Sequence, residues 1–272
     1  MFFEEVLPST TPRYEYEGIQ GFLHILEQEQ ERYEREGSFN PYIIFAIDEH
    51  SFLECFVDSE EDLLTKSWET YDHSSHNILI KMETANHAVA AGAFDSIFST
   101  WARRVRDNPL ACTARTAVRG HTRTKRADSS WTPVFLPAGR SPKWPTLVLE
   151  VAWSERRPKL ERDIDFWLRE SNGDVKVVLS ITVHPCGIIS IEKWDLSPTS
   201  SGNGTAPRPT QKIEIVRKPT PNCPRVKGQI QLQFQDIFLR DKEGTDIDFI
   251  ISHSDMEEIA SQVWGFQFEQ EG

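Results

Sequence analysis

The sequence predicts an α/β fold in which a mixed central sheet is flanked by helices. Between Thr84 and Val183, stretches with apolar residues at three- and four-residue intervals, typical of amphipathic helices, alternate with short apolar runs typical of strands. Their order is helix, strand, strand, strand, helix, strand. Such an order places helices against a sheet, and 272 residues suffice for one large core or two small ones.

The first eighty residues precede this core and predict a separate, acidic part of the chain. Residues 18–37 have a helical pattern with one apolar face and a glutamate-rich remainder, 42–47 form a short strand, and 59–67 form an acidic helix. We therefore divide the chain into residues 1–80, an acidic N-terminal extension packed on the core, and residues 81–272, the α/β domain.

The elements of the core follow from periodicity and turn residues. They are a helix at 84–106, a hairpin of strands at 113–120 and 122–130, a strand at 146–153, a helix at 156–171 and a strand at 174–183. Further strands are predicted at 187–194, 212–217 and 229–234, with a last helix at 254–264. Residues 197–210 are rich in Ser, Gly and Pro, which predicts a mobile surface loop.

Composition excludes several classes of protein. The N-terminus passes directly from Met1-Phe2-Phe3 to two glutamates, which is not typical of a signal peptide, and no apolar run approaches the roughly 18 residues of a membrane helix. The four cysteines are far apart and lack the spacing of a zinc site or a disulfide framework. We expect an intracellular protein, cytoplasmic or nuclear, with no membrane partner.

Charge is distributed unevenly along the chain. The formal net charge is -12, yet residues 103–126 carry eight basic residues against the single acid Asp107. Acidic residues crowd the predicted helix at 18–37 and the C-terminal part of the chain. The basic segment could bind the phosphates of a nucleic acid and the acidic ends could bind a protein partner, whereas the simpler interpretation is a set of solvated faces. No pattern indicates an oligomeric state.

Two carboxylates stand out because of their surroundings. Glu150 interrupts an apolar strand, and a buried carboxylate needs a cation, a metal or hydrogen-bond donors. Asp128 lies in the polar turn before Ser129-Ser130 and is the candidate second ligand. Together they could hold a hard divalent cation such as Mg²⁺. The alternatives are an ion pair between Glu150 and an arginine, and a turn in which Asp128 caps its own backbone.

The order of elements and the position of these two acids resemble the PD-(D/E)XK phosphodiesterase superfamily, which has the restriction-endonuclease-like fold. Four stretches resemble more closely an uncharacterised fungal group that is usually placed in that superfamily. They are Trp144-Pro145-Thr146-Leu147-Val148-Leu149-Glu150-Val151, Ser154-Glu155, Phe166-Trp167-Leu168 and Ile191-Glu192-Lys193-Trp194. The likeness extends from about Thr84 to Trp264. It implies a restriction-endonuclease-like core with N-terminal and C-terminal additions.

The resemblance also implies roles for individual residues. Asp128 and Glu150 would bind one or two Mg²⁺ ions that activate a water molecule. Ala152 stands where the family has its lysine, so Lys159 on the following helix would replace it, with Arg156 and Arg157 as poorer substitutes. Candidate nucleic-acid contacts are Arg119, Arg123, Lys125, Arg126, Arg156 and Arg157.

Other residues near the predicted site allow more than one interpretation. Many members of the superfamily carry a further acid on the first core helix; here Glu83 or His87 could face the site. The histidines show no ligand spacing, however, and we interpret them as structural. Lys159 could equally be a solvated helix lysine.

Three functions are compatible with these observations. The first is a Mg²⁺-dependent nuclease. The second is a catalytically decayed member of the same fold that binds nucleic acid or protein, which Ala152 and the acidic composition favour. The third is an interaction scaffold that uses its acidic helices. The motifs of nucleotide hydrolases, dinucleotide oxidoreductases, serine hydrolases and zinc proteases are absent from the sequence.

Overall fold

The computed structural model describes residues 2–36, 40–82, 85–105, 107–113, 116–153, 157–198 and 205–268. The chain forms two compact units. The first contains residues 1–83 together with 115–126, and the second contains residues 84–114 and 127–272. No helix within the described ranges is long and apolar enough to cross a membrane.

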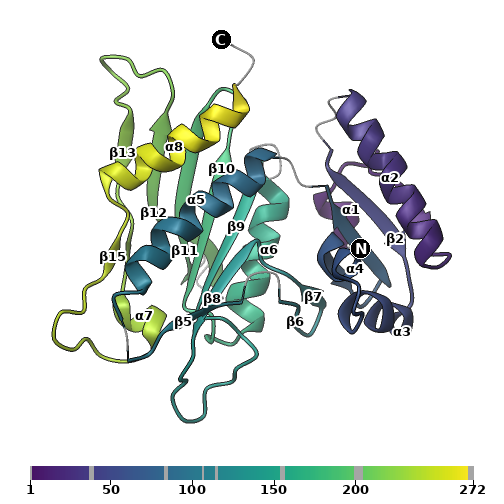
Figure 1. The fold of residues 1–272 in the computed structure, drawn as a ribbon, viewed down its shortest axis with the longest axis horizontal. Helices are drawn as coiled ribbons and strands as arrows, with labels where there is room; N and C mark the ends of the chain where they lie inside the picture. The colour runs from purple at the N-terminus through teal and green to yellow at the C-terminus, as the bar shows by residue number, and fades with distance from the viewer. Residues whose placement is uncertain are drawn as a thin grey trace. The chain divides into compact units, whose positions relative to one another are not determined.

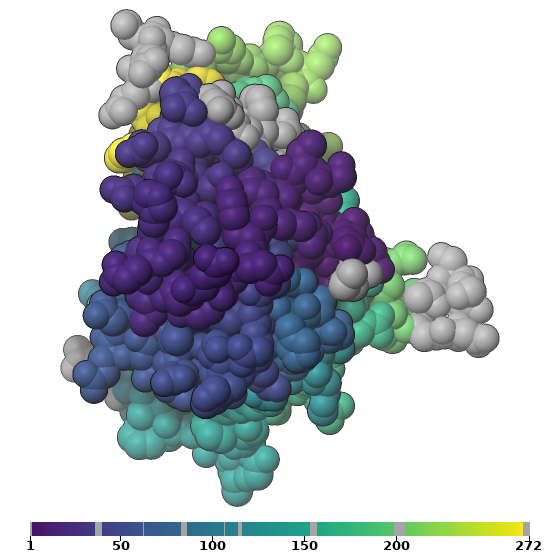
Figure 2. Space-filling model, turned by 90° about the vertical axis from the view of Figure 1, so that its right-hand side faces the viewer, coloured from purple at the N-terminus to yellow at the C-terminus, as the bar shows by residue number. Residues whose placement is uncertain are grey.

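The first unit is built on a six-stranded sheet with its own aromatic core. The strand order is β1 (Arg13–Glu15), β2 (Tyr42–Ala46), β4 (Asn77–Lys81), β3 (Trp68–Asp72), β7 (Arg123–Lys125) and β6 (Val118–Arg119). The helices are α1 (Phe2–Val6), α2 (Ile19–Glu36), α3 (Glu49–Phe52), the π-helical η1 (Leu53–Val57) and α4 (Asp62–Ser67). Phe22 of α2 packs into a cluster with Phe45, Phe52 and Phe56, as the apolar face of its helix predicts. Figure 2 looks onto this unit, where α2 (purple) forms part of the surface.

The second unit contains a seven-stranded mixed sheet. The strand order is β13 (Val226–Gly228), β12 (Thr205–Val216), β11 (Ile188–Pro198), β10 (Val177–Val183), β9 (Leu147–Trp153), β8 (Ser129–Pro133) and β5 (Leu110–Cys112). Among the described strand pairs of this sheet, only β9 and β10 run parallel, and the connection between them contains α6 (Arg157–Glu170). A parallel pair requires such a crossover helix. The remaining elements are α5 (Ala85–Ala102), α7 (Phe234–Phe238), α8 (His253–Gln267) and the small pair β14 (Gln231–Leu232) and β15 (Phe249–Ile250).

The two faces of this sheet differ in chemistry. Leu147, Leu149 and Val151 of β9 point into the main core, where they join side chains of α5 and α8 such as Phe94 and Ile259. Figure 1 shows α5 and α8 crossing this face. Because side chains alternate along a strand, the intervening positions of β9 project from the opposite face, where α6 packs. Glu150 is one of these positions.

The predicted α/β class is confirmed. Along the second unit the chain forms α5, β5, β8, β9, α6 and β10, which is the predicted order of helix, three strands, helix and strand. The core strands before β9 are not the predicted hairpin, however. That hairpin exists as β6 and β7, but it pairs with β3 in the sheet of the first unit.

The residues predicted as one strand at 122–130 are therefore two strands in different sheets. Ala127 and Asp128 lie between β7 and β8 and connect the two units along the chain. Both strands have an extended pattern, and the identity of a strand's partner is not encoded in that local pattern.

Part of the predicted loop at 197–210 is strand. Strand β11 continues to Pro198, and β12 begins at Thr205, so 205–210 is strand; residues 199–204 lie outside the described residues. Pro207 and Pro209 suggested a loop. They occupy the part of β12 that precedes its pairing with β13, where a missing N–H can be tolerated.

Candidate functional site

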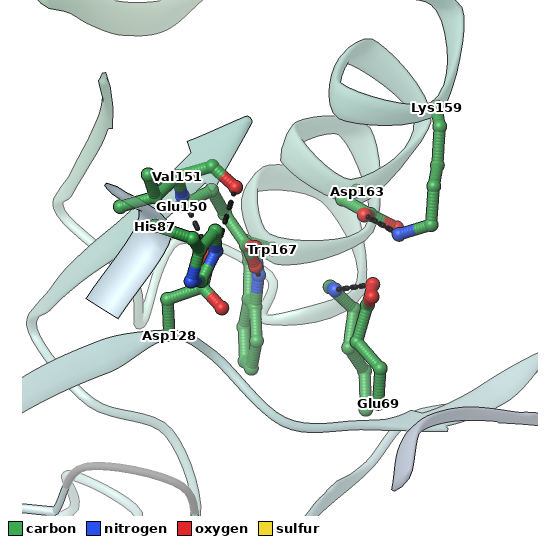
Figure 3. Close-up of polar contacts among 9 residues, drawn as sticks. Glu69, His87, Asp128, Glu150, Val151, Lys159, Asp163 and Trp167 are labelled. Atoms are coloured by element: carbon green, nitrogen blue, oxygen red, sulfur yellow. Dashed lines mark hydrogen bonds and ion pairs between the residues drawn. The ribbon is translucent and has the colours of Figure 1, made fainter. Parts of the chain in front are cut away.

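Asp128 connects the beginning of β8 to β9 and α5. Its Oδ2 accepts a hydrogen bond from the backbone N–H of Val151 at 2.6 Å. Nε2 of His87, in the first turns of α5, lies 3.1 Å from the same oxygen and 3.0 Å from the carbonyl oxygen of Val151 (Figure 3). The side chains of His87 and Asp128 are only 9% and 10% exposed. Two strands and a helix thus meet at one buried carboxylate.

The register of β8 and β9 brings the two predicted acids to neighbouring positions. Ser129 pairs with Leu149, and Asp128 directly precedes Ser129 while Glu150 directly follows Leu149. The two acids are 22 residues apart in the sequence, and the chain reversal between β8 and β9 brings their segments together.

Glu150 is held by a residue of α6. Its Oε1 accepts a hydrogen bond from Nε1 of Trp167 at 2.5 Å, and both side chains are buried (Figure 3). An indole N–H is a donor only, so it stabilises a carboxylate without adding a charge. The sequence interpretations of Glu150 named a metal and an arginine as partners. They missed the indole because residue 167 follows 17 residues later, on another element.

Lys159 also has a partner on its own helix. Its Nζ donates to Oδ2 of Asp163 at 2.7 Å, and the two side chains are 4% and 3% exposed. This corrects the alternative in which Lys159 is a solvated lysine. Lys159, Asp163 and Trp167 follow one another at i, i+4 and i+8, so they line one buried face of α6. Ala152 offers only a methyl group at the position two residues after Glu150.

A row of polar residues extends from Glu150 across the same face of the sheet. Glu150 pairs with Ser180 of β10, Ser180 with Glu192 of β11, and Glu192 with Lys212 of β12. Sequence reasoning missed this row, although the alternation of polar and apolar residues in β10 and β11 is a signal that could have found it.

Arg157 is joined to this row from the N-terminus of α6. Its Nη1 donates to Oε2 of Glu192 at 2.6 Å, and its guanidinium lies 4.7 Å from the ring centre of Trp194. Nearby, burial lowers the pKa of His184, and the positive charge of Lys212 lowers it further. Both effects favour the neutral form of the imidazole.

The remaining predicted nucleic-acid contacts lie in the first unit and have partners there. Lys125 is buried and its Nζ donates to Oε1 of Glu69 at 3.1 Å. Arg123 lies 4.0 Å from the ring centre of Phe2, and Arg126 lies 5.3 Å from that of Trp68. Arg119 is more exposed and is paired with Glu49. Arg156 and Glu83 lie outside the described residues.

Arg123, Lys125 and Arg126 are buried, and only Arg119 of these four cations is exposed. These basic residues, close together in the sequence, therefore do not form one exposed basic surface. Period-two alternation predicts which strand residues share a face, but it does not predict whether both faces are covered.

Asp128 and Glu150 are carboxylates, a ligand type that a hard divalent cation accepts together with several water molecules. Within the described part of the chain, no three His, Cys, Asp or Glu side chains are grouped to hold a metal ion, so a closed structural site is absent from those residues. Mg²⁺ is usually held by one or two carboxylates together with water and phosphate oxygens. Asp128 and Glu150 provide such carboxylates, and the Val151 N–H and Trp167 N–H fix them in place.

Comparisons with known proteins add little to this geometry. No protein-family model matches the chain, and no curated protein matches its sequence. Among solved structures, the chain is similar to one from Anabaena variabilis described as a "putative nuclease belonging to DUF820", with 12% sequence identity and a TM-score of 0.33. The match covers 49% of this chain and 82% of that chain. At this TM-score it carries no argument about fold or function, and none of the comparisons supports the likeness to a fungal group.

Proposed function

We propose that the second unit is a divalent-metal-dependent nuclease domain that hydrolyses phosphodiesters in nucleic acid, with Asp128 and Glu150 as the metal ligands. The observation that carries the proposal is the hydrogen bond from the Val151 N–H to Asp128, which holds this carboxylate beside the position of Glu150. A divalent metal held by such carboxylates would activate a water molecule for phosphodiester hydrolysis. The αβββαβ order of the second unit agrees with the same function.

Each acid has a donor that orients it. The Val151 N–H fixes Asp128, and the Trp167 N–H fixes Glu150, so little reorganisation is needed when a cation binds. Mg²⁺, when bound there, would polarise the scissile phosphate and lower the pKa of an attacking water molecule. The buried face of α6 supplies Lys159, which would stabilise negative charge on the phosphate after leaving Asp163.

A second function is favoured by two specific observations. Ala152 removes the lysine from its usual strand position, and the amine of Lys159 is already bound to Asp163. A domain with these features could bind nucleic acid or protein without cutting it. In that case Asp128 and Glu150 act as hydrogen-bond acceptors that hold β8, β9 and α6 together.

Cleavage assays on the full chain distinguish these two functions. Supercoiled plasmid and single-stranded RNA are incubated with the wild type, Asp128→Ala and Glu150→Gln in Mg²⁺ or Mn²⁺, and Glu161→Gln serves as a control because Glu161 is a half-exposed acid on α6. The nuclease proposal predicts cleavage by the wild type and Glu161→Gln, and a loss of at least about a hundredfold in the two site variants. Metal-independent cleavage, or no cleavage by any well-folded protein with either metal, would overturn it.

A further inference from the structure

The connection between β8 and β9 presents apolar side chains to solvent. Val134 and Phe135 directly follow β8, and these residues are 51% and 65% exposed. Phe135 is the most exposed large apolar residue within the described ranges. Figure 1 shows this connection extending beyond the ends of the two strands. Asp128 precedes β8 whereas Val134 follows it, so the connection lies apart from the site described above.

The backbone that carries these side chains is held in place by hydrogen bonds. Asn108 is buried, and its Oδ1 accepts a hydrogen bond from the N–H of Phe135 at 2.9 Å. Its Nδ2 donates to the carbonyl oxygen of Phe135 at 3.0 Å. The N–H of Val134 donates to the carbonyl oxygen of Pro109 at 3.0 Å. Because the backbone is already ordered, Phe135 can contact a partner with little loss of conformational entropy.

The same connection borders a surface pocket that is rich in cations. The pocket has a volume of about 530 Å³, and its lining includes Pro137, Arg140, Lys176, Arg240 and one acid, Asp241. Phe135 precedes Pro137 by two residues, so their Cα atoms lie within about 7 Å of each other. The exposed aromatic residue and the cationic pocket are therefore neighbours.

Lys176 is the cation of this pocket that is available to an anion. The residue is exposed, and its Nζ donates to the carbonyl oxygen of Gly173 at 2.6 Å. It forms no ion pair with the residues that the structure describes. An ammonium group has three N–H donors, so two of them remain for an anion.

The two arginines add positive charge that acids balance in part. Arg140 is paired with Asp174, and Arg240 is paired with Asp246 and Asp107. The Nε of each guanidinium is buried and has no hydrogen-bond partner among the described residues, so neither arginine has all its donors satisfied. The connection itself, residues 134–145, contains two cations and no acid in a chain of net charge -12. Its charge is complementary to a phosphate group.

We propose that this connection and the pocket bind single-stranded nucleic acid, with a base stacked on Phe135 and a neighbouring backbone phosphate bound by Lys176. An aromatic platform for bases beside cations for the backbone is the usual design of such sites. A duplex stacks its bases on one another, so its bases reach Phe135 only after unstacking. The site needs no metal and does not include Asp128 or Glu150, so it is independent of the proposed cleavage.

Fluorescence anisotropy of a labelled oligothymidylate, measured in EDTA, tests the aromatic contact. The wild type, Phe135→Tyr and the control Phe266→Ala should bind with similar affinities, because Phe266 is an exposed aromatic residue of α8. Phe135→Ala should lose at least about fivefold in affinity because the stacking surface is removed. Equal affinities of Phe135→Ala and the wild type, or no binding by the folded wild type at low salt, overturn the proposal.

The salt dependence of the same binding tests the phosphate contact. Lys176→Ala should weaken binding and reduce the slope of log affinity against log salt by about 0.7, the contribution of one phosphate of a single strand. Lys227→Ala removes an exposed lysine of β13 and should leave the slope unchanged. A slope that Lys176→Ala does not alter contradicts the phosphate contact.

Photochemical crosslinking provides a measurement that needs no variant. Irradiation of an oligonucleotide that contains 5-iodouracil links the base to an aromatic side chain stacked on it, and mass spectrometry identifies the residue. We expect a crosslink to Phe135 of the wild type. Crosslinks confined to other parts of the chain overturn the proposal.

The outcomes separate this proposal from the proposed function. Binding in EDTA that depends on Phe135, without cleavage by any protein in Mg²⁺ or Mn²⁺, supports this site and overturns the nuclease. Cleavage that depends on Asp128 and Glu150, with unchanged oligonucleotide affinity in Phe135→Ala, overturns only this inference. Self-association that Phe135→Ala abolishes, without oligonucleotide binding, also overturns it and assigns Phe135 to a contact between two copies of the chain.

Discussion

Oδ2 of Asp128 lies 2.6 Å from the backbone nitrogen of Val151, and this hydrogen bond joins the start of β8 to the strand that carries Glu150. Removing the acceptor leaves a buried N–H without that hydrogen bond, which costs about 1–3 kcal/mol. We therefore expect Asp128→Ala to lower the free energy of unfolding by about this amount. Asp128→Asn keeps a carbonyl acceptor and should lose clearly less. Urea denaturation of the two variants provides the comparison, and equal losses would show that the hydrogen bond contributes nothing.

The indole N–H of Trp167 should stabilise Glu150 beyond the packing of its ring. Trp167→Phe keeps most of the apolar surface but removes the donor, so we expect a loss of about 1–3 kcal/mol in the free energy of unfolding. A double-mutant cycle with Glu150→Gln should give a coupling energy of about 0.5–3 kcal/mol. Trp144→Phe, a buried neighbour of Trp167, is the matched control and should show no coupling with Glu150→Gln. A coupling energy of zero between Trp167 and Glu150 would contradict the stabilising role of the indole N–H.

Variants of the buried pair Lys159 and Asp163 distinguish an effect on stability from an effect on catalysis. Lys159→Met leaves the carboxylate of Asp163 without this cation, and breaking a buried pair costs about 3–5 kcal/mol. The double variant Lys159→Met/Asp163→Leu should recover most of that stability because no charge of the pair remains. If Lys159 acts on the phosphate, the recovered protein should still fail to cleave. Recovery of cleavage along with stability would assign Lys159 a purely structural role.

Tyr71 should make the first unit less stable at high pH. Burial, and then the negative charges of Glu49 and Asp48, raise its pKa from the ordinary value of 10.0 to about 12. The unfolded chain releases this proton near pH 10 while the folded chain keeps it, so rising pH favours unfolding. The contribution is complete below about pH 10 and is lost between about pH 10 and 12.

Denaturation at several alkaline pH values tests this expectation. Tyr71→Phe should reduce the fall in the free energy of unfolding between about pH 10 and 12. A fall of equal size in the wild type and Tyr71→Phe would assign the alkaline instability to other groups.

The sequence predicted the features that depend on local patterns. The periodicity of 84–106 indicated α5, and an apolar run with one carboxylate indicated β9 with Glu150. The position of Asp128 shortly before that strand was also visible. Both acids could therefore be named without a structure, and their role as metal ligands stays a prediction.

The features that the sequence did not predict depend on long-range pairing. Whether β7 would join β8 or β3 is decided by the packing of whole units, and the residues from 116 to 126 look alike in both cases. The partners of Glu150 and Asp128, Trp167 and His87, lie on helices before and after the strands, where no spacing rule connects them. The Lys159–Asp163 pair was the exception, since its i,i+4 spacing was readable from the sequence.

The most direct test of the central claim is a calorimetric titration of Mn²⁺ into the wild type and into Asp128→Ala/Glu150→Ala, each first shown to be folded by circular dichroism. We expect saturable binding to the wild type and none to the double variant. Binding of equal affinity to both proteins would contradict the claim that these two carboxylates form the metal site.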